Sequence, residues 1–511
     1  MSRLRALPIP VHPTVLALVF VVELFVVSGV SPFPVLRTLA LAAIIPLGLT
    51  VGACLVMGDR HRGGFVATVL VLAVMAGGDL RIAMLVGVVL LALLAERFIL
   101  PAKRRTIRWH RISALTSRLV AILVLAVSIH ALQSGTPGVI ARAISQESMR
   151  PSAPTVPVAA GDPDIYMILL DGYARDDVLR EVFSVEGPTL ADRLADRDFD
   201  VASRSRSNYM LTAQVLISMF NMQHLHDQPR MAGVLAGDPG QPQSIIIRDV
   251  LNDNAVFEIL RARGYWIEAI SSGFEEVAFR EADRFIDSGD LNEFEIGMLR
   301  RTLLGDLLRV ISPGAASAQQ RHRIEDILRV TPTGSGRPAN RPVFVFSHLP
   351  YPHAPWVYHA DGTARDVEDL EAFYADTTGT TGENVEELAA GYADAVIDLD
   401  GRVLAMLDEL DRAIAARGRP AVTIIFSDHG SWVGADGGDI RLRLKNLLAI
   451  RSTACAIELP DDQTLINVFP MLLDQLYGIP VERLLDTTYR FDGRDEFNLT
   501  PLDDPDAATA P

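Results

Sequence analysis

Three apolar segments of the sequence end directly on carboxylate or imidazole side chains. The residues are Asp171 after 165–170, His348 and His353 after 343–346, and Asp428 and His429 after 422–426. Oxygen and nitrogen ligands of these kinds suit Zn²⁺, Mn²⁺ or a similar divalent ion. Taken alone, Asp171 fits a helix cap or a turn residue. The three segment ends together favour a metal site.

Thr212 is the candidate nucleophile. It lies in the segment 207–222, where an apolar helical run begins. A helix N-terminus and a nearby bound cation both favour the alkoxide of a threonine, and the same backbone amides can hold a phosphate. The alternative interpretation is that Thr212 only caps this helix.

The segments that carry these residues alternate with helical patterns. Short β-rich runs are predicted at 165–170, 266–271, 343–346 and 422–426, and helices at 255–263, 384–417 and 464–477. Continuous apolar strands separated by helices are typical of an α/β domain with a mostly parallel sheet that is covered on both faces. In such sheets, ligands bind beyond the carboxyl ends of the strands, which is where the candidate residues lie.

The charges divide the 511-residue chain into two parts. Up to Ser134 there are 13 Lys and Arg residues against 4 Asp and Glu residues, a net charge of +9, so the total of −16 leaves −25 for the remainder. The basic part is strongly apolar, which excludes a simple soluble enzyme. The acidic part would repel phosphate backbones, which excludes a nucleic-acid-binding protein.

The apolar part predicts about five membrane-spanning helices, with four as the alternative. The runs are 15–30, 36–57, 64–77, 82–100 and 115–132. Arginine and lysine residues gather before the first run, after the second and after the fourth, so those loops are expected in the cytoplasm. The protein is therefore predicted to be multi-pass in an inner or plasma membrane, with a cytoplasmic N-terminus and an extracytoplasmic acidic domain.

The domain boundaries follow from these patterns. We expect a transmembrane domain over 1–134, a Pro- and Ser-rich linker over 135–163, a catalytic domain over 164–497 and a disordered acidic tail over 498–511. The two cysteines, Cys54 and Cys455, lie in unlike environments, so no disulfide between them is expected.

These motifs together resemble the alkaline phosphatase superfamily. The matching segments are Asp171-Gly, the Thr212-Ala run, His348 with His353, and Ser427-Asp428-His429-Gly. The nearest branch is that of sulfatase-like membrane enzymes, which includes phosphoethanolamine transferases and lipoteichoic acid synthases. The plan of five spans followed by an extracytoplasmic α/β domain is similar too. The scarcity of Lys relative to Arg suggests a bacterial source.

The resemblance implies a role for each matching residue. Asp171, Thr212, Asp428 and His429 would bind one catalytic divalent metal, Zn²⁺ or Mn²⁺ first, with Mg²⁺ and Ca²⁺ as alternatives. Thr212 would attack phosphorus and carry a phospho-intermediate. His348 and His353 would hold the substrate phosphate or protonate the leaving group, as imidazole can. His353 is otherwise an ordinary surface residue of a proline-rich loop.

The implied activity is transfer of a phospho-headgroup, of the phosphoethanolamine or phosphoglycerol type, from a phospholipid donor to a glycan or lipid acceptor of the cell envelope. The enzyme would act as a monomer. A hydrolase or phosphodiesterase on the same site is the first alternative, and a non-catalytic envelope scaffold is the second.

Three features depart from the family pattern. Asp171 stands where the transferases usually have Glu, and no histidine follows His429. Neither cysteine lies in a Cys/Ser-x-Pro-x-Arg motif, which argues against sulfate-ester hydrolysis. The missing histidine favours a single metal, and it is also the main support for the scaffold alternative.

Other polar residues have two interpretations each. Arg175 and the run 441–446 could meet an anionic headgroup or lie on a solvated face. Trp356 and Tyr358 follow His353 and are expected to pack in the core or to stack on a sugar. The acidic residues of the long helical stretch, Asp394, Asp398 and Asp400, are expected on its wet face.

Overall fold

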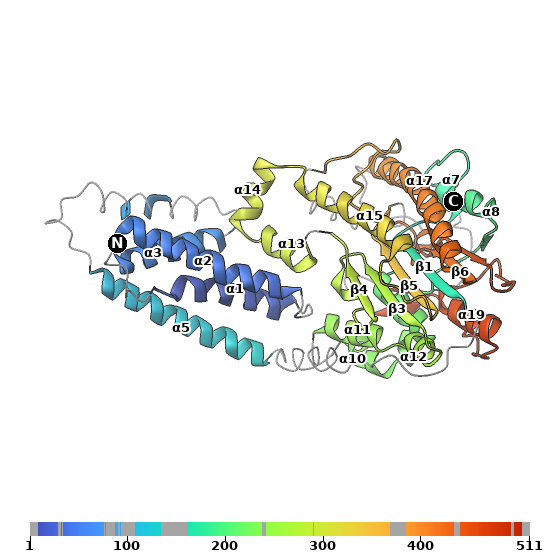
Figure 1. Cartoon of the computed structure of the whole chain (residues 1–511), viewed down its shortest axis with the longest axis horizontal. Helices are drawn as coiled ribbons and strands as arrows, with labels where there is room; N and C mark the ends of the chain where they lie inside the picture. The colour runs from blue at the N-terminus through green and yellow to red at the C-terminus, as the bar shows by residue number, and fades with distance from the viewer. Residues whose placement is uncertain are drawn as a thin grey trace. The chain divides into compact units, whose positions relative to one another are not determined.

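The structure is a computed structural model of the whole chain (Figure 1). It describes residues 9–28, 32, 34–75, 77, 87–89, 92–93, 108–133, 161–237, 242–289, 291–367, 385–433, 440–491 and 495–502. The chain divides into two compact units, each described by itself below. The smaller unit comprises Met1–Ser148 and Leu291–Pro313, and the larger comprises Met149–Asp290 and Gly314–Pro511.

A seven-stranded sheet forms the centre of the larger unit, in the order β2-β7-β6-β1-β5-β3-β4. The strands from β6 to β4 are parallel, while β7 runs antiparallel to β6 and β2 antiparallel to β7. Their bounds are β1 Asp164–Leu170, β2 Asp200–Val201, β3 Trp266–Ser271, β4 Arg284–Asp287, β5 Val343–Leu349, β6 Ala421–Phe426 and β7 Leu448–Ser452. The predicted mostly parallel α/β sheet is confirmed.

Helices cover both faces of this sheet. The α-helices of the larger unit are α7 Asp176–Glu181, α8 Leu190–Ala195, α9 Thr212–Asn221, α10 Ala232–Leu235, α11 Gln243–Asn252, α12 Ala255–Ala262, α15 Ala315–Thr333, α17 Val385–Arg417, α18 Arg441–Leu444 and α19 Val468–Tyr477. Short 3-10 turns lie at Leu225–Asp227, Pro229–Met231, Glu275–Val277 and Leu465–Asn467. A two-stranded ribbon, β8 Tyr489–Phe491 and β9 Leu499–Pro501, lies outside the main sheet.

The two faces of β1 show why the fold needs both layers. Ile165, Met167 and Leu169 belong to one apolar core, with α9, α11, α12 and α19. The alternating residues Tyr166, Ile168 and Leu170 belong to a second core, with α7, α8, α15 and α17. Side chains of a strand alternate between faces, so an uninterrupted apolar strand has to be covered on both sides.

Helix α17 corrects one expectation about its acidic residues. Its apolar side chains recur at helical spacing and pack into the second core. Asp394 is partly exposed, but Asp398 and Asp400 are 7% and 4% exposed rather than on the wet face. Asp398 pairs with Arg402 at 2.8 Å, and Asp400 accepts a hydrogen bond from Tyr173 at 2.7 Å. Arg402 lies four residues after Asp398 in the same helix, but Tyr173 comes from another segment, and local helical periodicity could not reveal that partner.

The smaller unit contains the apolar helices α1 His12–Ser28, α2 Val35–Met57, α3 Arg60–Met75 and α5 Trp109–Gln133. Among the described residues, α2 and α5 are long and apolar enough to cross a membrane, and α1 is a shorter apolar helix. Only 17% of the apolar window of each long helix is buried, unlike the core helix of a soluble protein. Two clear spans are fewer than the five predicted. Most of the fourth predicted span, 82–100, lies outside the described residues.

Several boundaries differ from the expected domain plan. Residues Leu291–Pro313, named here the returning segment, join the smaller unit although they lie within the predicted catalytic domain. Strand β9 uses residues that the sequence assigned to the tail, and positions 503–511 lie outside the described residues, as does most of the linker. Cys54 and Cys455 are both free thiols, as expected.

Candidate metal and phosphate site

The sheet register brings the predicted metal ligands to one level. Leu169 of β1 pairs with Phe426 of β6, so Asp171 and Asp428 each stand two residues beyond a paired position on neighbouring strands. His429 follows at once. The ligand atoms of Asp171, Asp428 and His429 lie within 4.8 Å of one another, and all three residues are buried. The convergence expected from the strand ends is therefore present.

Each carboxylate has one anchored oxygen and one oxygen that the described residues leave without a hydrogen bond. Oδ2 of Asp171 lies 3.0 Å from Nε2 of His348, and Oδ1 of Asp428 accepts from the amide of Gly172 at 3.2 Å. The other oxygens, Oδ1 of Asp171 and Oδ2 of Asp428, are buried without a partner among the described residues. Buried polar atoms are rarely left unpaired, so these two point to a missing ligand.

The spacing of these atoms fits a small divalent ion. Nε2 of His429 lies 3.1 Å from the unpaired oxygen of Asp428 and 3.9 Å from that of Asp171. Ligands of a tetrahedral ion with bonds of about 2.1 Å stand about 3.4 Å apart. Two carboxylates and one imidazole are a donor set that suits Zn²⁺ or Mn²⁺. The residues present therefore fit the implied metal.

The imidazole of His429 is held in the form that binds metals. Its Nδ1 donates to the carbonyl oxygen of Gly430 at 2.9 Å, which leaves Nε2 as the acceptor. Burial, reinforced by the nearby charge of Arg443, lowers the pKa of His429 well below its usual value. A neutral imidazole with a fixed tautomer is the species that ligates a metal.

The two carboxylates titrate as a pair. Burial and repulsion by Asp171 raise the pKa of Asp428 to about 7. Burial also opposes ionisation of Asp171, but the neighbouring His353, His348 and His429 hold its pKa below the usual range. Two buried carboxylates this close favour retaining one proton between them, and a divalent cation would replace that proton.

Glycine at two positions lets the ligand loops come together. Gly172 has φ +76°, and a Cβ there would lie 3.8 Å from both His353 and His429. At Gly430 a Cβ would lie 2.8 Å from the carbonyl oxygen of Leu442. The Ser427 hydroxyl accepts from the Tyr173 amide at 2.8 Å and donates to the His429 carbonyl, which ties the two ligand loops to each other.

Thr212 is the first residue of α9, and Leu211 occupies the cap position without a side-chain cap hydrogen bond. The alternative that Thr212 is merely the helix cap is therefore not what the structure shows. Its hydroxyl is close enough to Asp428 to hydrogen-bond with that carboxylate. Thr212 is partly exposed, whereas residues 214–220 of α9 are buried in the core. The helix thus positions this hydroxyl beside the ligand cluster.

The two predicted histidines occupy different places. His348 belongs to β5, is 2% exposed and hydrogen-bonds to Asp171. His353 lies in the following loop, where Nδ1 donates to the carbonyl oxygen of Ala354 at 2.8 Å. His353 is partly buried and lines the pocket together with Gly172 and His429, and a role for it in substrate binding stays a prediction.

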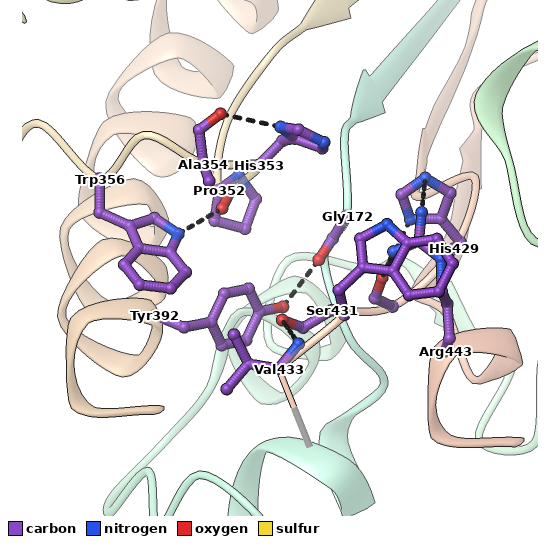
Figure 2. A pocket seen from close by; sticks show the side chains of 12 residues that line it. Gly172, Pro352, His353, Ala354, Trp356, Tyr392, His429, Ser431, Val433 and Arg443 are labelled. Carbon is purple, nitrogen blue, oxygen red and sulfur yellow. Dashed lines mark hydrogen bonds between the residues drawn. The ribbon is translucent and has the colours of Figure 1, made fainter. Parts of the chain in front are cut away.

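Figure 2 shows this pocket between the two ligand loops and α17. Its walls combine imidazole, guanidinium and aromatic groups. The lining residues are Gly172, Pro352, His353, Ala354, Trp356, Tyr392, His429, Gly430, Ser431, Trp432, Val433 and Arg443. Trp356 is 2% exposed, and its Nε1 donates to the Pro352 carbonyl oxygen. Tyr392 donates to the Gly172 carbonyl oxygen at 2.7 Å and so supports the loop behind Asp171.

Arg443 is the pocket residue that sequence reasoning identified least clearly. It is 2% exposed, stacks 3.6 Å above the ring of Trp432, and donates to the carbonyl oxygens of Gly430 and Met210. Its Nη2 also lies 2.9 Å from Nε2 of His429. The sequence marked Arg443 only as one of several cations in 441–446. Its burial depends on contacts between distant segments, so no local signal could single it out.

Arg175 differs from Arg443. Its guanidinium forms a two-point pair with Asp177 at 2.7 and 2.8 Å and donates to the Ser205 carbonyl oxygen at 3.0 Å. It is not among the residues that line the described pocket. A role for Arg175 in headgroup binding stays a prediction.

No protein-family model matches the sequence, and no curated protein matches it. Among solved structures, the full-length integral membrane protein lipooligosaccharide phosphoethanolamine transferase A (EptA) from Neisseria meningitidis is similar, with 12% identity and a TM-score of 0.40. The similarity covers 85% of this chain and 83% of that one. The periplasmic domain of EptC from Escherichia coli, solved in complex with Zn, is 13% identical with a TM-score of 0.40, over 63% of this chain and 84% of that one.

A protein in the alkaline phosphatase superfamily from Vibrio parahaemolyticus is also similar, with 13% identity, a TM-score of 0.39, and coverage of 67% of this chain and 83% of that one. The name of this third protein gives the superfamily that the sequence motifs resemble. At such low identity and TM-score, what this chain does has to be inferred from its own side chains.

Proposed function

We propose that this protein is a membrane-anchored, metal-dependent phosphotransferase that moves a phospho-headgroup from a lipid donor to a cell-envelope glycan or lipid. The observation that carries the proposal is the convergence of two unpaired carboxylate oxygens and a neutral imidazole beside Thr212 at the start of α9. The phosphoethanolamine or phosphoglycerol identity of the headgroup follows from the sequence resemblance.

The residues that would hold the metal are Asp171, Thr212, Asp428 and His429. When bound, a divalent metal supplies positive charge that stabilises phosphoryl oxygens and lowers the pKa of a nearby hydroxyl. The Thr212 hydroxyl lies close to Asp428, and that carboxylate would orient it. Thr212 is the first residue of α9, and the unpaired amides of a helix N-terminus favour an anion nearby.

The reaction would proceed in two transfers at Thr212. The Thr212 hydroxyl would first lose its proton to solvent. Its Oγ would then form a bond to phosphorus while the bond from phosphorus to the diacylglycerol oxygen breaks, and that oxygen would take up a proton. His353 lines the pocket and is the candidate donor of this proton. The hydroxyl of the acceptor would then attack phosphorus and give its proton to His353, while the bond between phosphorus and Thr212 breaks. The chain would act as a monomer.

The topology proposed for this reaction has five spans with the catalytic domain outside the cytoplasm. The alternation of basic loops favours it, and α1, α2, α3 and α5 correspond to four of the five predicted spans. Such a topology keeps the domain beside the outer leaflet, where a lipid headgroup can reach the pocket.

The test is the intact mass of the purified full-length protein after incubation with bacterial phospholipids. We expect an adduct mapped to Thr212, with a mass that identifies the headgroup, and no adduct in Thr212→Ala. Ser431 carries an aliphatic hydroxyl and lines the pocket, so Ser431→Ala is the matched control and should keep the adduct.

Other outcomes would change the proposal. Release of free headgroup without an added acceptor would favour the hydrolase alternative on the same site. A metal-free protein that forms no adduct under any condition would favour the scaffold alternative. An adduct that persists in Thr212→Ala would overturn the assignment of the nucleophile.

A further inference from the structure

The returning segment, Leu291–Pro313, leaves the larger unit and packs within the smaller one. It contains two helices, α13 Glu293–Arg300 and α14 Leu303–Ile311 (Figure 1). The chain therefore passes between the units three times, at 148–149, 290–291 and 313–314. The proposed phosphotransfer gives this detour no role.

Helix α13 is firmly attached to the apolar helices. Phe294 is 4% exposed and belongs to the same apolar cluster as Phe25 of α1 and Val35 of α2. Glu295 forms an ion pair with Arg37 of α2. Asn292, which also caps α13, donates to the carbonyl oxygen of Pro34 at 3.0 Å. Apolar, ionic and hydrogen-bonding contacts thus fix α13 against the start of α2.

These contacts all lie at one end of the helical unit. Pro34 and Arg37 stand where α2 begins, close in sequence to the end of α1. Gly77, just beyond the end of α3, comes so near Arg301 that an added Cβ would lie 3.3 Å from its carbonyl oxygen. The charge pattern predicts that this end, with its few basic residues, is the extracytoplasmic one. The returning segment therefore docks at the predicted outer surface of the membrane.

Helix α14 differs from α13 because none of its residues is buried. Its large apolar side chains are exposed, and they are Leu304 at 46%, Leu307 at 50%, Leu308 at 44%, Val310 at 82% and Ile311 at 70%. Asp306 and Arg309 pair with each other at 2.5 Å. Five exposed large apolar side chains on nine residues would be costly in water.

The lipid bilayer is the partner that fits this surface. Nine helical residues span about 14 Å, too short to cross about 30 Å of hydrocarbon. A short helix with an apolar face lies in the plane of the interface instead. Helix α14 contacts α3 in the same unit, so it lies beside a helix that is predicted to span the membrane.

The charges favour apolar insertion over electrostatic attraction. The returning segment contains three arginines, Arg300, Arg301 and Arg309, and three acidic residues, Glu293, Glu295 and Asp306. The segment is therefore neutral overall. Binding that depends on apolar area should change little with salt, whereas attraction to anionic headgroups is screened.

We propose that the returning segment is a membrane attachment of the catalytic domain, in which α14 lies in the outer interface with its apolar side chains among the lipid chains. The attachment restricts the domain by chain connections additional to the linker after α5. It concerns where the domain is held and not what it catalyses. The Thr212 adduct and the position of α14 are therefore independent tests.

The experiment uses the full-length protein in phosphatidylethanolamine–phosphatidylglycerol vesicles. Cys54 and Cys455 are replaced by Ser, and a single cysteine at Val310→Cys carries an environment-sensitive fluorophore. The matched control is Leu485→Cys, because Leu485 of the larger unit is also 82% exposed. We expect nitroxide lipids to quench the label at 310 several times more strongly than the label at 485, and aqueous iodide to do the reverse.

Two results would overturn the proposal. If iodide quenches both labels equally, α14 lies in water. If neither quencher reaches the label at 310, a second copy of the chain or another protein covers α14. Both cysteines replace exposed side chains, so neither variant should disturb folding, and far-ultraviolet circular dichroism checks this directly.

Discussion

Nε2 of His348 lies 3.0 Å from Oδ2 of Asp171, while the second oxygen of that carboxylate has no hydrogen bond among the described residues. That other oxygen, Oδ1, lies 3.9 Å from Nε2 of His429. His348 is 2% exposed and comes from β5, the strand next to β1 in the sheet. Its clearest role is thus to orient a metal ligand. A direct contact with substrate phosphate stays a prediction.

Replacing His348 should weaken metal binding. Residues behind a metal ligand typically contribute about 10–100-fold in affinity, so His348→Ala should lose about that much. His348→Gln keeps a hydrogen-bond donor to Asp171 and should recover part of the lost metal affinity. Competition with a chelating dye measures the affinity. His359→Ala changes an exposed histidine and is the control. An unchanged metal affinity in His348→Ala would show that His348 does not orient Asp171 for metal binding.

Asp428→Asn should separate metal binding from stability. Metal affinity should fall by at least about 100-fold, because a charged ligand is lost. The metal-free protein should become more stable at pH 8, by about 2 kcal/mol, because the burial of a charge and its repulsion by Asp171, which together raise the pKa of Asp428 to about 7, no longer apply to a neutral side chain.

The direction of this stability change follows from the raised pKa of Asp428. A carboxyl group whose pKa is raised by folding contributes stability below its unfolded pKa, near 3.8, and loses it as the pH rises through about 7. Thermal unfolding after chelation of the metal, at pH 5 and pH 8, measures this difference. A metal-free Asp428→Asn that is less stable than the wild type at pH 8 would contradict it.

Arg443 should affect metal binding and turnover in opposite directions. Its guanidinium lies 2.9 Å from Nε2 of His429, the nitrogen that would bind the proposed metal, so it would oppose a cation there. In the pocket it is also placed to attract a substrate phosphate. Arg443→Met should bind metal up to about 10-fold more tightly, equivalent to about 1.4 kcal/mol, and lose about 100-fold in kcat/KM for the lipid donor.

The control for Arg443 is a neighbouring cation of α18. Arg441 belongs to the same short helix and is not among the residues that line the pocket. Arg441→Met should therefore leave both quantities near the wild-type values. Weaker metal binding in Arg443→Met would mean that the arginine supports the site structurally.

The sequence predicted those parts of the site that depend on strand ends. Asp171 and Asp428 follow apolar runs, and neighbouring parallel strands end at one edge, so their meeting follows from the fold class. The antiparallel strand β7 was not predicted, because a short run near the chain's end gives no information about its partner's direction. The burial of Arg443 was not predictable either, since it arises from segments more than 200 residues away.

The placement of the returning segment could not be predicted from the sequence either. The pattern of α14 indicates an amphipathic helix, but it does not say which unit the helix joins. The docking of Phe294 and Glu295 on the apolar helices and the contact of α14 with α3 assign it to the smaller unit. Contacts between distant segments decide such placements, and periodicity within a segment cannot.

The last prediction concerns a buried carboxyl group outside the metal site. Asp400 of α17 is 4% exposed, and burial raises its pKa to about 7 despite the hydrogen bond from Tyr173. The folded protein therefore keeps a proton that the unfolded chain loses near pH 4. The contribution of Asp400 to stability is present at low pH and is lost as the pH rises toward about 7.

Asp400→Asn should remove this pH dependence. Asparagine keeps an oxygen for Tyr173 and cannot ionise, so above pH 7 the variant should be about 2 kcal/mol more stable than the wild type. Unfolding followed by tryptophan fluorescence from pH 5 to 8.5, with saturating metal so that Asp428 does not titrate, measures the effect. Asp408→Asn changes an exposed carboxylate of the same helix and should follow the wild-type curve. Parallel curves for wild type and Asp400→Asn would mean that the buried carboxyl group is already ionised.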